Sequence, residues 1–186
     1  FNLEEINNAN SGGSNPRILR TSVQDILQLK NAGKKPFVVI AWTSEHRFEL
    51  CSIKNNEWLQ FNAGENSKDA EFEEIYWQRY GSDYGNKESF AVQAYLMQTF
   101  LKNLNIPYLM LHAFNPVVLP RKSSLENFCK NLDYTNFLPD LTLMGYLSQW
   151  PNIKYGPGGH PLEDAHYKLY EFIAGLIDKR YRIEKL

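Results

Sequence analysis

The sequence has only two cysteines, Cys51 and Cys129, too few for a disulfide framework and not spaced as metal ligands are. We therefore expect free thiols in a reducing compartment and no metal site. The chain also has no excess of basic residues, since its formal net charge is −1. Proteins that bind nucleic acid or anionic membranes through charge need a basic surface, so neither partner is expected.

No apolar run approaches the roughly 20 residues that a membrane span needs, and no signal-peptide pattern is visible. The phosphate-loop lysine motif and the glycine fingerprint of dinucleotide sites are missing too, so we expect no cofactor. What the chain does have is a globular composition: 186 residues, of which 43% are hydrophobic and 14% aromatic. This predicts a single domain over residues 1–186.

The first 42 residues predict a βαβ unit. A weak strand is expected over residues 3–10, followed by a glycine turn at Gly12. Asn15 is a good N-cap and Pro16 a good first helical residue, so a helix should begin there and run to about residue 32. Residues 36–42 form a continuous apolar run, which is typical of a strand covered on both faces.

Helices and strands alternate along the rest of the chain. A hairpin is expected near residues 48–62 and a second buried strand at 107–114. The helical patterns cover residues 69–80, 87–104, 123–132, 140–148 and 161–177. Helices that alternate with buried strands predict a three-layer α/β/α sandwich around a mostly parallel sheet.

Polar loops are expected at the carboxyl ends of the strands, where open parallel sheets bind ligands. Gly12 lies in a turn that opens a helix, whose backbone N–H groups can face an anion. Thr43 and Ser44 follow the first buried strand and offer hydroxyl donors, with His46 and Arg47 just beyond them. These two loops supply candidate binding residues.

A third loop carries His160 directly before a proline and a helix. The positive end of the helix dipole disfavours the imidazolium form there, so the ring stays neutral and available as a base. Two other histidines are expected to pack rather than to react, because His112 lies within a strand and His166 lies on the apolar stripe of the last helix.

Together the three loops resemble the conserved blocks of the SGNH/GDSL hydrolase superfamily, in a divergent branch common in phages. Gly12 stands at the oxyanion-glycine position, Thr43 where the family has its oxyanion Asn, and His160-Pro161 in the block of the catalytic histidine. Pro157 stands where that block has its Asp, and no Gly-Asp-Ser-like motif precedes Gly12. The chain is therefore expected to lack the nucleophile block, either because it begins inside a longer protein or because another segment fills the gap.

The resemblance implies a flavodoxin-like fold and the hydrolysis of an ester or acetyl ester through a serine acyl-enzyme. His160 would act as general base and then general acid, and Gly12 and Thr43 would bind the oxyanion. Arg47 suggests an anionic or polyhydroxylated substrate, a small molecule or a glycan ester. The substrate cleft would be lined by Ser14, Asn15, Trp42, Ser44, His46 and Arg47.

The alternative is a non-catalytic protein that keeps the fold for binding or for structure. The replaced acid and the missing nucleophile favour it. A virion-associated protein that grips a glycan in its cleft would fit, as a homo-oligomer or within a larger assembly. The two interpretations place the protein in the cytoplasm or in a virion.

Overall fold

The computed structural model describes most of the chain, namely residues 5–10, 12–62, 70–79, 81–117, 126–157 and 160–181.

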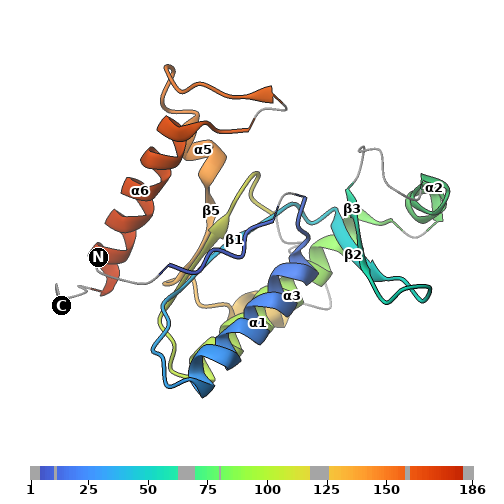
Figure 1. Ribbon diagram of the computed structural model, residues 1–186, viewed down its shortest axis with the longest axis horizontal. Helices are drawn as coiled ribbons and strands as arrows, with labels where there is room; N and C mark the ends of the chain where they lie inside the picture. The colour runs from blue at the N-terminus through green and yellow to red at the C-terminus, as the bar shows by residue number, and fades with distance from the viewer. Residues whose placement is uncertain are drawn as a thin grey trace.

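Within these residues the chain is a mixed α/β fold around an open sheet of three parallel strands (Figure 1). β1 (Val38–Trp42) pairs with β4 (Tyr108–His112), and β4 pairs in turn with β5 (Phe137–Thr142). The α/β class and the parallel sheet predicted from the sequence are confirmed. None of the helices in the described ranges is both long and apolar enough to cross a membrane.

The two apolar runs of the sequence take different places in the sheet. β4 is the central strand, and all five of its residues are buried. β1 is an edge strand of the described sheet, and Val39 is 41% exposed. The prediction that residues 36–42 are covered on both faces is therefore wrong, because an apolar run does not by itself distinguish an edge strand from a central one. The strand expected at 3–10 is also not formed over its described part, residues 5–10, which are mostly polar and exposed.

Helix α1 (Asn15–Asn31) begins one residue before the expected position. Its N-cap is Ser14, whose Oγ accepts a hydrogen bond from Arg17 N at 3.3 Å. The prediction that Asn15 is the cap is wrong, because Ser14 already has the extended backbone of a cap. The Asn15 side chain is thus available for a different bond, at the end of β1. Gly33, with φ of +73°, follows the helix as expected.

Helix α3 (Asp83–Asn103) packs beside α1 against one face of the sheet (Figure 1). It begins four residues earlier than predicted because Ser82 caps it, accepting from Gly85 N at 3.2 Å. The core that the two helices share with the sheet includes Ile26, Ile40, Trp42, Phe90, Met97, Leu101, Met110 and Phe137. Burial of one large apolar side chain of this kind contributes roughly 1.5–3 kcal/mol to the free energy of folding.

The hairpin predicted near residues 48–62 is confirmed. β2 (Arg47–Cys51) and β3 (Trp58–Asn62) pair antiparallel. Helix α2 (Ala70–Arg79) packs on them through aromatic rings: Phe48 stacks on Tyr76 with ring centroids 4.1 Å apart and on Phe61 at 4.9 Å. The hairpin and α2 therefore have a small aromatic core of their own.

In the described part of the last third of the chain lie α4 (Glu126–Asn131), α5 (Leu143–Leu147) and α6 (Glu163–Tyr181). The helix predicted over 140–148 is shorter than expected, because residues up to 142 belong to β5. At the end of α6, Tyr181 Oη donates to the Tyr108 carbonyl at 2.6 Å, which ties the helix to the central strand.

A partly buried ion pair joins the hairpin to α1. Arg20 donates from Nε and Nη2 to the two carboxylate oxygens of Glu49, at 3.0 and 3.1 Å. The Glu49 side chain is 1% exposed, whereas that of Arg20 is 35% exposed. The guanidinium also lies over the Trp58 ring, 4.2 Å from its centroid. A carboxylate this deeply buried depends on its partner, because an unpaired charge there is costly.

Substitution of Arg20 by Met should therefore destabilise the protein. We expect the free energy of unfolding, measured by urea denaturation, to fall by about 2 kcal/mol, less than for a fully buried pair because Arg20 is partly exposed. The matched control is Lys130→Met, which removes an exposed pair with Glu126 and should have a much smaller effect. Equal losses in both variants would contradict the role of the Arg20–Glu49 pair.

Candidate functional site

The carboxyl end of β1 is held by a side chain of α1. Asn15 Nδ2 donates to the Thr43 carbonyl at 3.2 Å, and Thr43 N–H donates to Asn15 Oδ1 at 2.9 Å. The same Nδ2 lies 3.4 Å from the Ser44 carbonyl. Because an amide side chain offers one donor face and one acceptor, as a peptide group does, Asn15 continues the strand's hydrogen bonding at this point. Both Asn15 and Thr43 are buried, so the turn that follows β1 starts from a fixed place.

A cavity of about 260 Å³ opens beside this link, between the start of α1, the turn from β1 to β2, α2 and the first turns of α3. Its position at the end of a parallel strand is the one predicted for ligand binding. Two rings from the hairpin and α2, Phe48 and Tyr76, and one from α3, Phe90, form its apolar part. Its polar part is formed by Asn15, Glu45, Arg47, Ser82, Asn86, Ser89 and Gln93.

Gln93 has an unsatisfied polar atom at this cavity. Its Nε2 donates to Ser89 Oγ at 2.9 Å, but its Oε1 is buried and has no hydrogen-bond partner among the described residues. If the amide is turned round, Oε1 accepts from the serine hydroxyl and Nε2 is left over, so one end is unpaired in either orientation. An unpaired buried polar atom costs roughly 1–3 kcal/mol, which makes Gln93 a candidate to bind a ligand.

Charges of both signs meet at the cavity. Arg47 Nη1 donates to Thr43 Oγ1 at 3.0 Å, and its guanidinium lies 5.0 Å from the centroid of the Phe114 ring. Glu45, two residues before Arg47, also lines the cavity. The lining therefore carries one cation and one anion.

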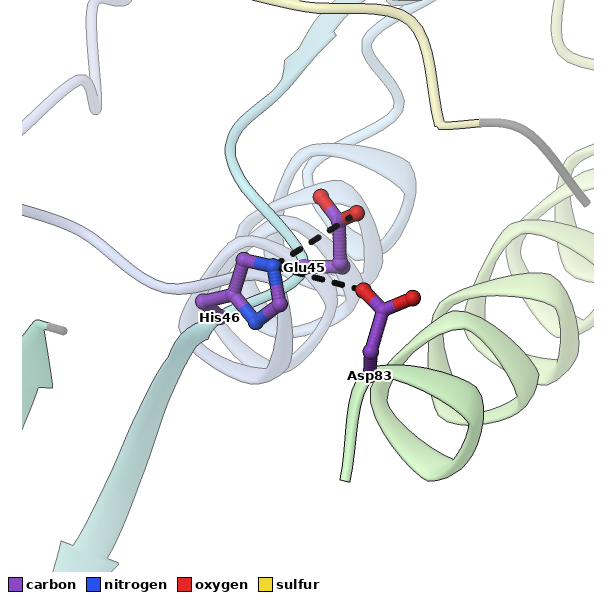
Figure 2. A group of neighbouring side chains, drawn as sticks. All are labelled: Glu45, His46 and Asp83. Carbon is purple, nitrogen blue, oxygen red and sulfur yellow. Dashed lines mark ion pairs between the residues drawn. The ribbon is translucent and has the colours of Figure 1, made fainter. Parts of the chain in front are cut away.

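Glu45 belongs to a cluster with His46 and Asp83 at the edge of the cavity (Figure 2). His46 Nε2 lies 3.9 Å from Glu45 Oε1 and 3.6 Å from Asp83 Oδ1. On the other side of the ring, Nδ1 is 3.3 Å from Asn86 Nδ2. Lys87 Nζ binds the other oxygen of Asp83 at 2.7 Å, and this hydrogen bond is the main cause of a lowered pKa for the Asp83 carboxyl.

The sequence did not predict this cluster. Glu45 and His46 are adjacent, but the third member comes from the first residue of α3, far along the chain. No local spacing indicates such a contact. The expectation that the chain has no metal ligands was based on spacing alone.

The structure brings several of the predicted site residues together. Asn15, Thr43, Ser44 and Arg47 lie within one hydrogen-bonded group, and His46 lies at its rim. Gly12 has φ of +71°, and a Cβ there would come 3.2 Å from Asn62 Nδ2, so the glycine turn lies against the end of β3.

Ser14 and Trp42 are fully buried and are not among the residues that line this cavity. Ser14 caps α1, and the Trp42 ring meets Phe90 edge-on at 5.7 Å. Both residues were predicted to line the cleft, but the structure gives Ser14 a capping role and Trp42 a packing role instead.

His160 lies elsewhere in the described structure. It is exposed, its carbonyl accepts from Gly156 N at 2.8 Å, and an antiparallel bridge joins Tyr155 to Pro161. Figure 1 shows this orange segment next to the start of α6, apart from β2 and the start of α3. The predicted base is therefore not brought to the group around Asn15 and Thr43. Residues 158 and 159, in the glycine turn before it, lie outside the described ranges.

Comparison with known proteins gives one match. Residues 2–137 match the model of DUF6071, a family of unknown function. No curated protein and no solved structure matches the chain.

Behind the cavity, His112 ends the central strand, buried between aromatic rings. It is 0% exposed, and its ring centroid is 5.3 Å from that of Phe90 and 5.6 Å from that of Phe137. Neither ring nitrogen has a hydrogen-bond partner in the described part of the chain. Burial lowers the pKa of His112 to about 4, against a smaller opposing effect of Asp140. The packing role predicted for this histidine is confirmed.

This pKa predicts a specific loss of stability in acid. An unfolded histidine has a pKa of about 6.5, whereas His112 in the folded protein stays neutral until the pH is near 4. Between these two pH values the unfolded chain binds a proton that the folded protein does not bind. The free energy of unfolding therefore has its full value above pH 6.5 and falls as the pH drops toward 4. Over that interval, the free energy of unfolding should fall by about 3 kcal/mol more in the wild type than in His112→Leu.

Urea denaturation at a series of pH values measures this difference. Carboxylates contribute equally to both proteins, so only the difference between the two pH profiles reports on His112. Parallel profiles would mean that the histidine finds a partner for its charge in the folded state.

Proposed function

We propose that this chain, which belongs to the DUF6071 family, binds a small uncharged polyhydroxylated molecule, about one carbohydrate ring in size, in the cavity at the end of β1. The observation that carries the proposal is the buried amide end of Gln93 at the cavity, which has no hydrogen-bond partner among the residues that the structure describes. Such an atom is satisfied by a ligand group that can donate or accept a hydrogen bond, and a hydroxyl can do both.

The composition of the cavity favours this ligand class. Drug-sized ligands use mostly apolar cavities of roughly 300–1,000 Å³, whereas this one is smaller and mostly polar. Ser82 and Ser89 accept hydrogen bonds through Oγ, and each still has a hydroxyl proton to donate. The apolar part of the lining, from Phe48, Tyr76 and Phe90, can contact the C–H groups of a sugar ring.

The charges argue against phosphate or carboxylate ligands. Arg47 is the cation of the lining, and it is balanced by Glu45. Asp83 adds a second carboxylate near the same edge. Lys87 pairs with that carboxylate at 2.7 Å, so cations and carboxylates balance at this edge and no net positive charge attracts an anion. An uncharged ligand therefore fits better. In this interpretation the protein is a non-catalytic glycan-binding component, for example of a virion.

Gln93→Leu should weaken ligand binding without loss of stability. Calorimetric titration of the wild type with glucose, galactose, mannose and N-acetylglucosamine should find at least one ligand, with a dissociation constant of about 1 mM for a single ring. The leucine variant should bind it at least tenfold more weakly, since the amide no longer contributes. Its stability should be unchanged or higher, because a buried unpaired polar atom has been removed.

Gln98→Leu is the matched control on the same helix. The Gln98 amide is fully paired, donating to the Asp133 carbonyl at 3.1 Å and accepting from Asp133 N at 2.9 Å. Its replacement should lower stability and leave ligand affinity unchanged. The proposal is wrong if no sugar binds the wild type, or if Gln93→Leu binds as tightly as the wild type.

The second candidate is the ester hydrolase that the resemblance implies, with a flavodoxin-like three-layer arrangement of the fold. The convergence of Asn15, Thr43 and Arg47 at the end of β1 favours it. Two observations count against it. The Thr43 N–H is already bonded to Asn15, so Thr43 can offer an oxyanion only its hydroxyl group. His160 also lies in a different segment from this group.

A fluorophosphonate probe separates the two candidates, because it labels activated serines. We expect no labelling, and equal turnover of p-nitrophenyl acetate by the wild type and His160→Ala. Labelling of a serine at the cavity, together with turnover that needs His160, would establish the hydrolase instead.

A further inference from the structure

The cluster of Glu45, His46 and Asp83 has the chemistry and the spacing of a metal site (Figure 2). It offers one imidazole nitrogen and two carboxylates, and the ligand atoms all lie within 4.8 Å of one another. We propose that these three side chains bind a divalent first-row transition-metal ion such as Zn²⁺. The proposal concerns the protein without any other ligand, so it does not depend on what the cavity binds.

The distances within the cluster fit a bridging ion better than direct contact. His46 Nε2 is 3.9 and 3.6 Å from the two carboxylate oxygens, beyond the roughly 3.2 Å limit of a good N–H···O hydrogen bond. Two ligand atoms about 2.0–2.1 Å from a tetrahedral ion are about 3.3 Å apart. The two nitrogen–oxygen separations exceed this spacing by only a few tenths of an ångström, and all three ligand atoms lie within 4.8 Å of one another.

The ring of His46 is also held in the required orientation. Nε2 faces the two carboxylates, while Nδ1 faces the Asn86 amide at 3.3 Å. With that amide turned so that its oxygen accepts from Nδ1–H, the Nε2 lone pair points at the carboxylates. A metal-bound histidine usually donates its second N–H in this way, which fixes its tautomer.

The surrounding fold keeps the ligands in place. Glu45 and His46 belong to the turn that Asn15 holds at Thr43 and Ser44, and the Glu45 side chain is only 15% exposed. Within the described residues, its one ion pair is the long contact with His46. This carboxylate is mostly removed from water and forms no short ion pair with a described residue, so a bound ion would stabilise it.

Imidazole with two carboxylates suits a transition metal more than Mg²⁺ or Ca²⁺, which prefer oxygen ligands only. Three protein ligands leave a fourth position of a tetrahedral ion open. Glu45 lines the cavity as well as the cluster, so this position lies at the edge of the cavity.

Substitution of Lys87 should raise the metal affinity, whereas substitution of a ligand should lower it. Its ammonium group holds Asp83 Oδ2 at 2.7 Å, which leaves Oδ1 for an ion but places a positive charge close by. Removal of that charge by Lys87→Met should tighten metal binding severalfold. Removal of a ligand, in His46→Ala or Glu45→Gln, should weaken it at least tenfold.

The experiment is calorimetric titration of the purified protein with ZnCl₂, repeated for each variant. We expect one ion per chain in the wild type. His166→Ala is the control, since this histidine is exposed on α6 with Glu163 and Asp164 nearby in the sequence but forms no part of the cluster. It should bind as the wild type does. Circular dichroism confirms folding, and Glu45→Gln keeps the test valid if His46→Ala does not fold.

Substitution of Co²⁺ for Zn²⁺ adds a spectroscopic readout, because the visible absorption of Co²⁺ reports a tetrahedral site with a nitrogen ligand. This band should be lost in His46→Ala. The proposal is overturned if the wild type gives no saturable Zn²⁺ binding, or if His46→Ala and Glu45→Gln bind as tightly as the wild type.

Discussion

The amide of Asn15, bonded to the backbone of Thr43, is the contact on which the site depends. It joins the first residue of α1 to the end of β1, an edge strand that pairs with β4 alone in the described sheet. The turn from β1 to β2 leaves from this fixed point, and Glu45, His46 and Arg47 all project from that turn. Without the Asn15–Thr43 link, this turn would not be held in place beside the cavity and the cluster of Glu45, His46 and Asp83.

Two further contacts hold the hairpin and α2 in place beside the cavity. The partly buried Arg20–Glu49 pair joins the hairpin to α1, and the stacked rings of Phe48 and Tyr76 join α2 to the hairpin. The cavity thus lies between elements that are each tied to the main core or to the aromatic core. Two glutamines of α3 differ in one respect. Gln98, outside the cavity, is paired at both ends of its amide, whereas Gln93, which lines the cavity, has one end without a partner among the described residues. This contrast supports the proposed role of Gln93.

Much of the fold could be predicted because it depends on local patterns. Apolar runs predicted β1 and β4, two short β-like runs predicted the hairpin, and helical spacing predicted α1, α3 and α6. β5 was missed because Pro139 and Asp140 interrupt its apolar pattern. Whether β1 is central or at an edge depends on its neighbours in space, which no local pattern contains. The same holds for the N-cap of α1, where Ser14 and Asn15 are both suitable residues.

The site was predictable only in part, for a related reason. Polar residues that follow a buried strand meet at its carboxyl end, so Asn15, Thr43, Ser44 and Arg47 could be placed together from the sequence. The contribution of α3 could not. Ser89 and Gln93 look like the solvent side of a helix, and Asp83 like an ordinary first-turn carboxylate. The family resemblance extended the site to His160, which lies on a segment apart from this group.

The central claim is that the cavity at the end of β1 binds a polyhydroxylated ligand through Gln93. The most direct measurement is a two-dimensional NMR titration of the ¹⁵N-labelled protein with monosaccharides, following the side-chain amide signals. The account predicts that the Gln93 signal shifts in a saturable way, together with that of Asn86, while the signal of Gln98 stays in place. Saturable shifts confined to residues outside the cavity, or no shift of the Gln93 amide with any sugar, would contradict it.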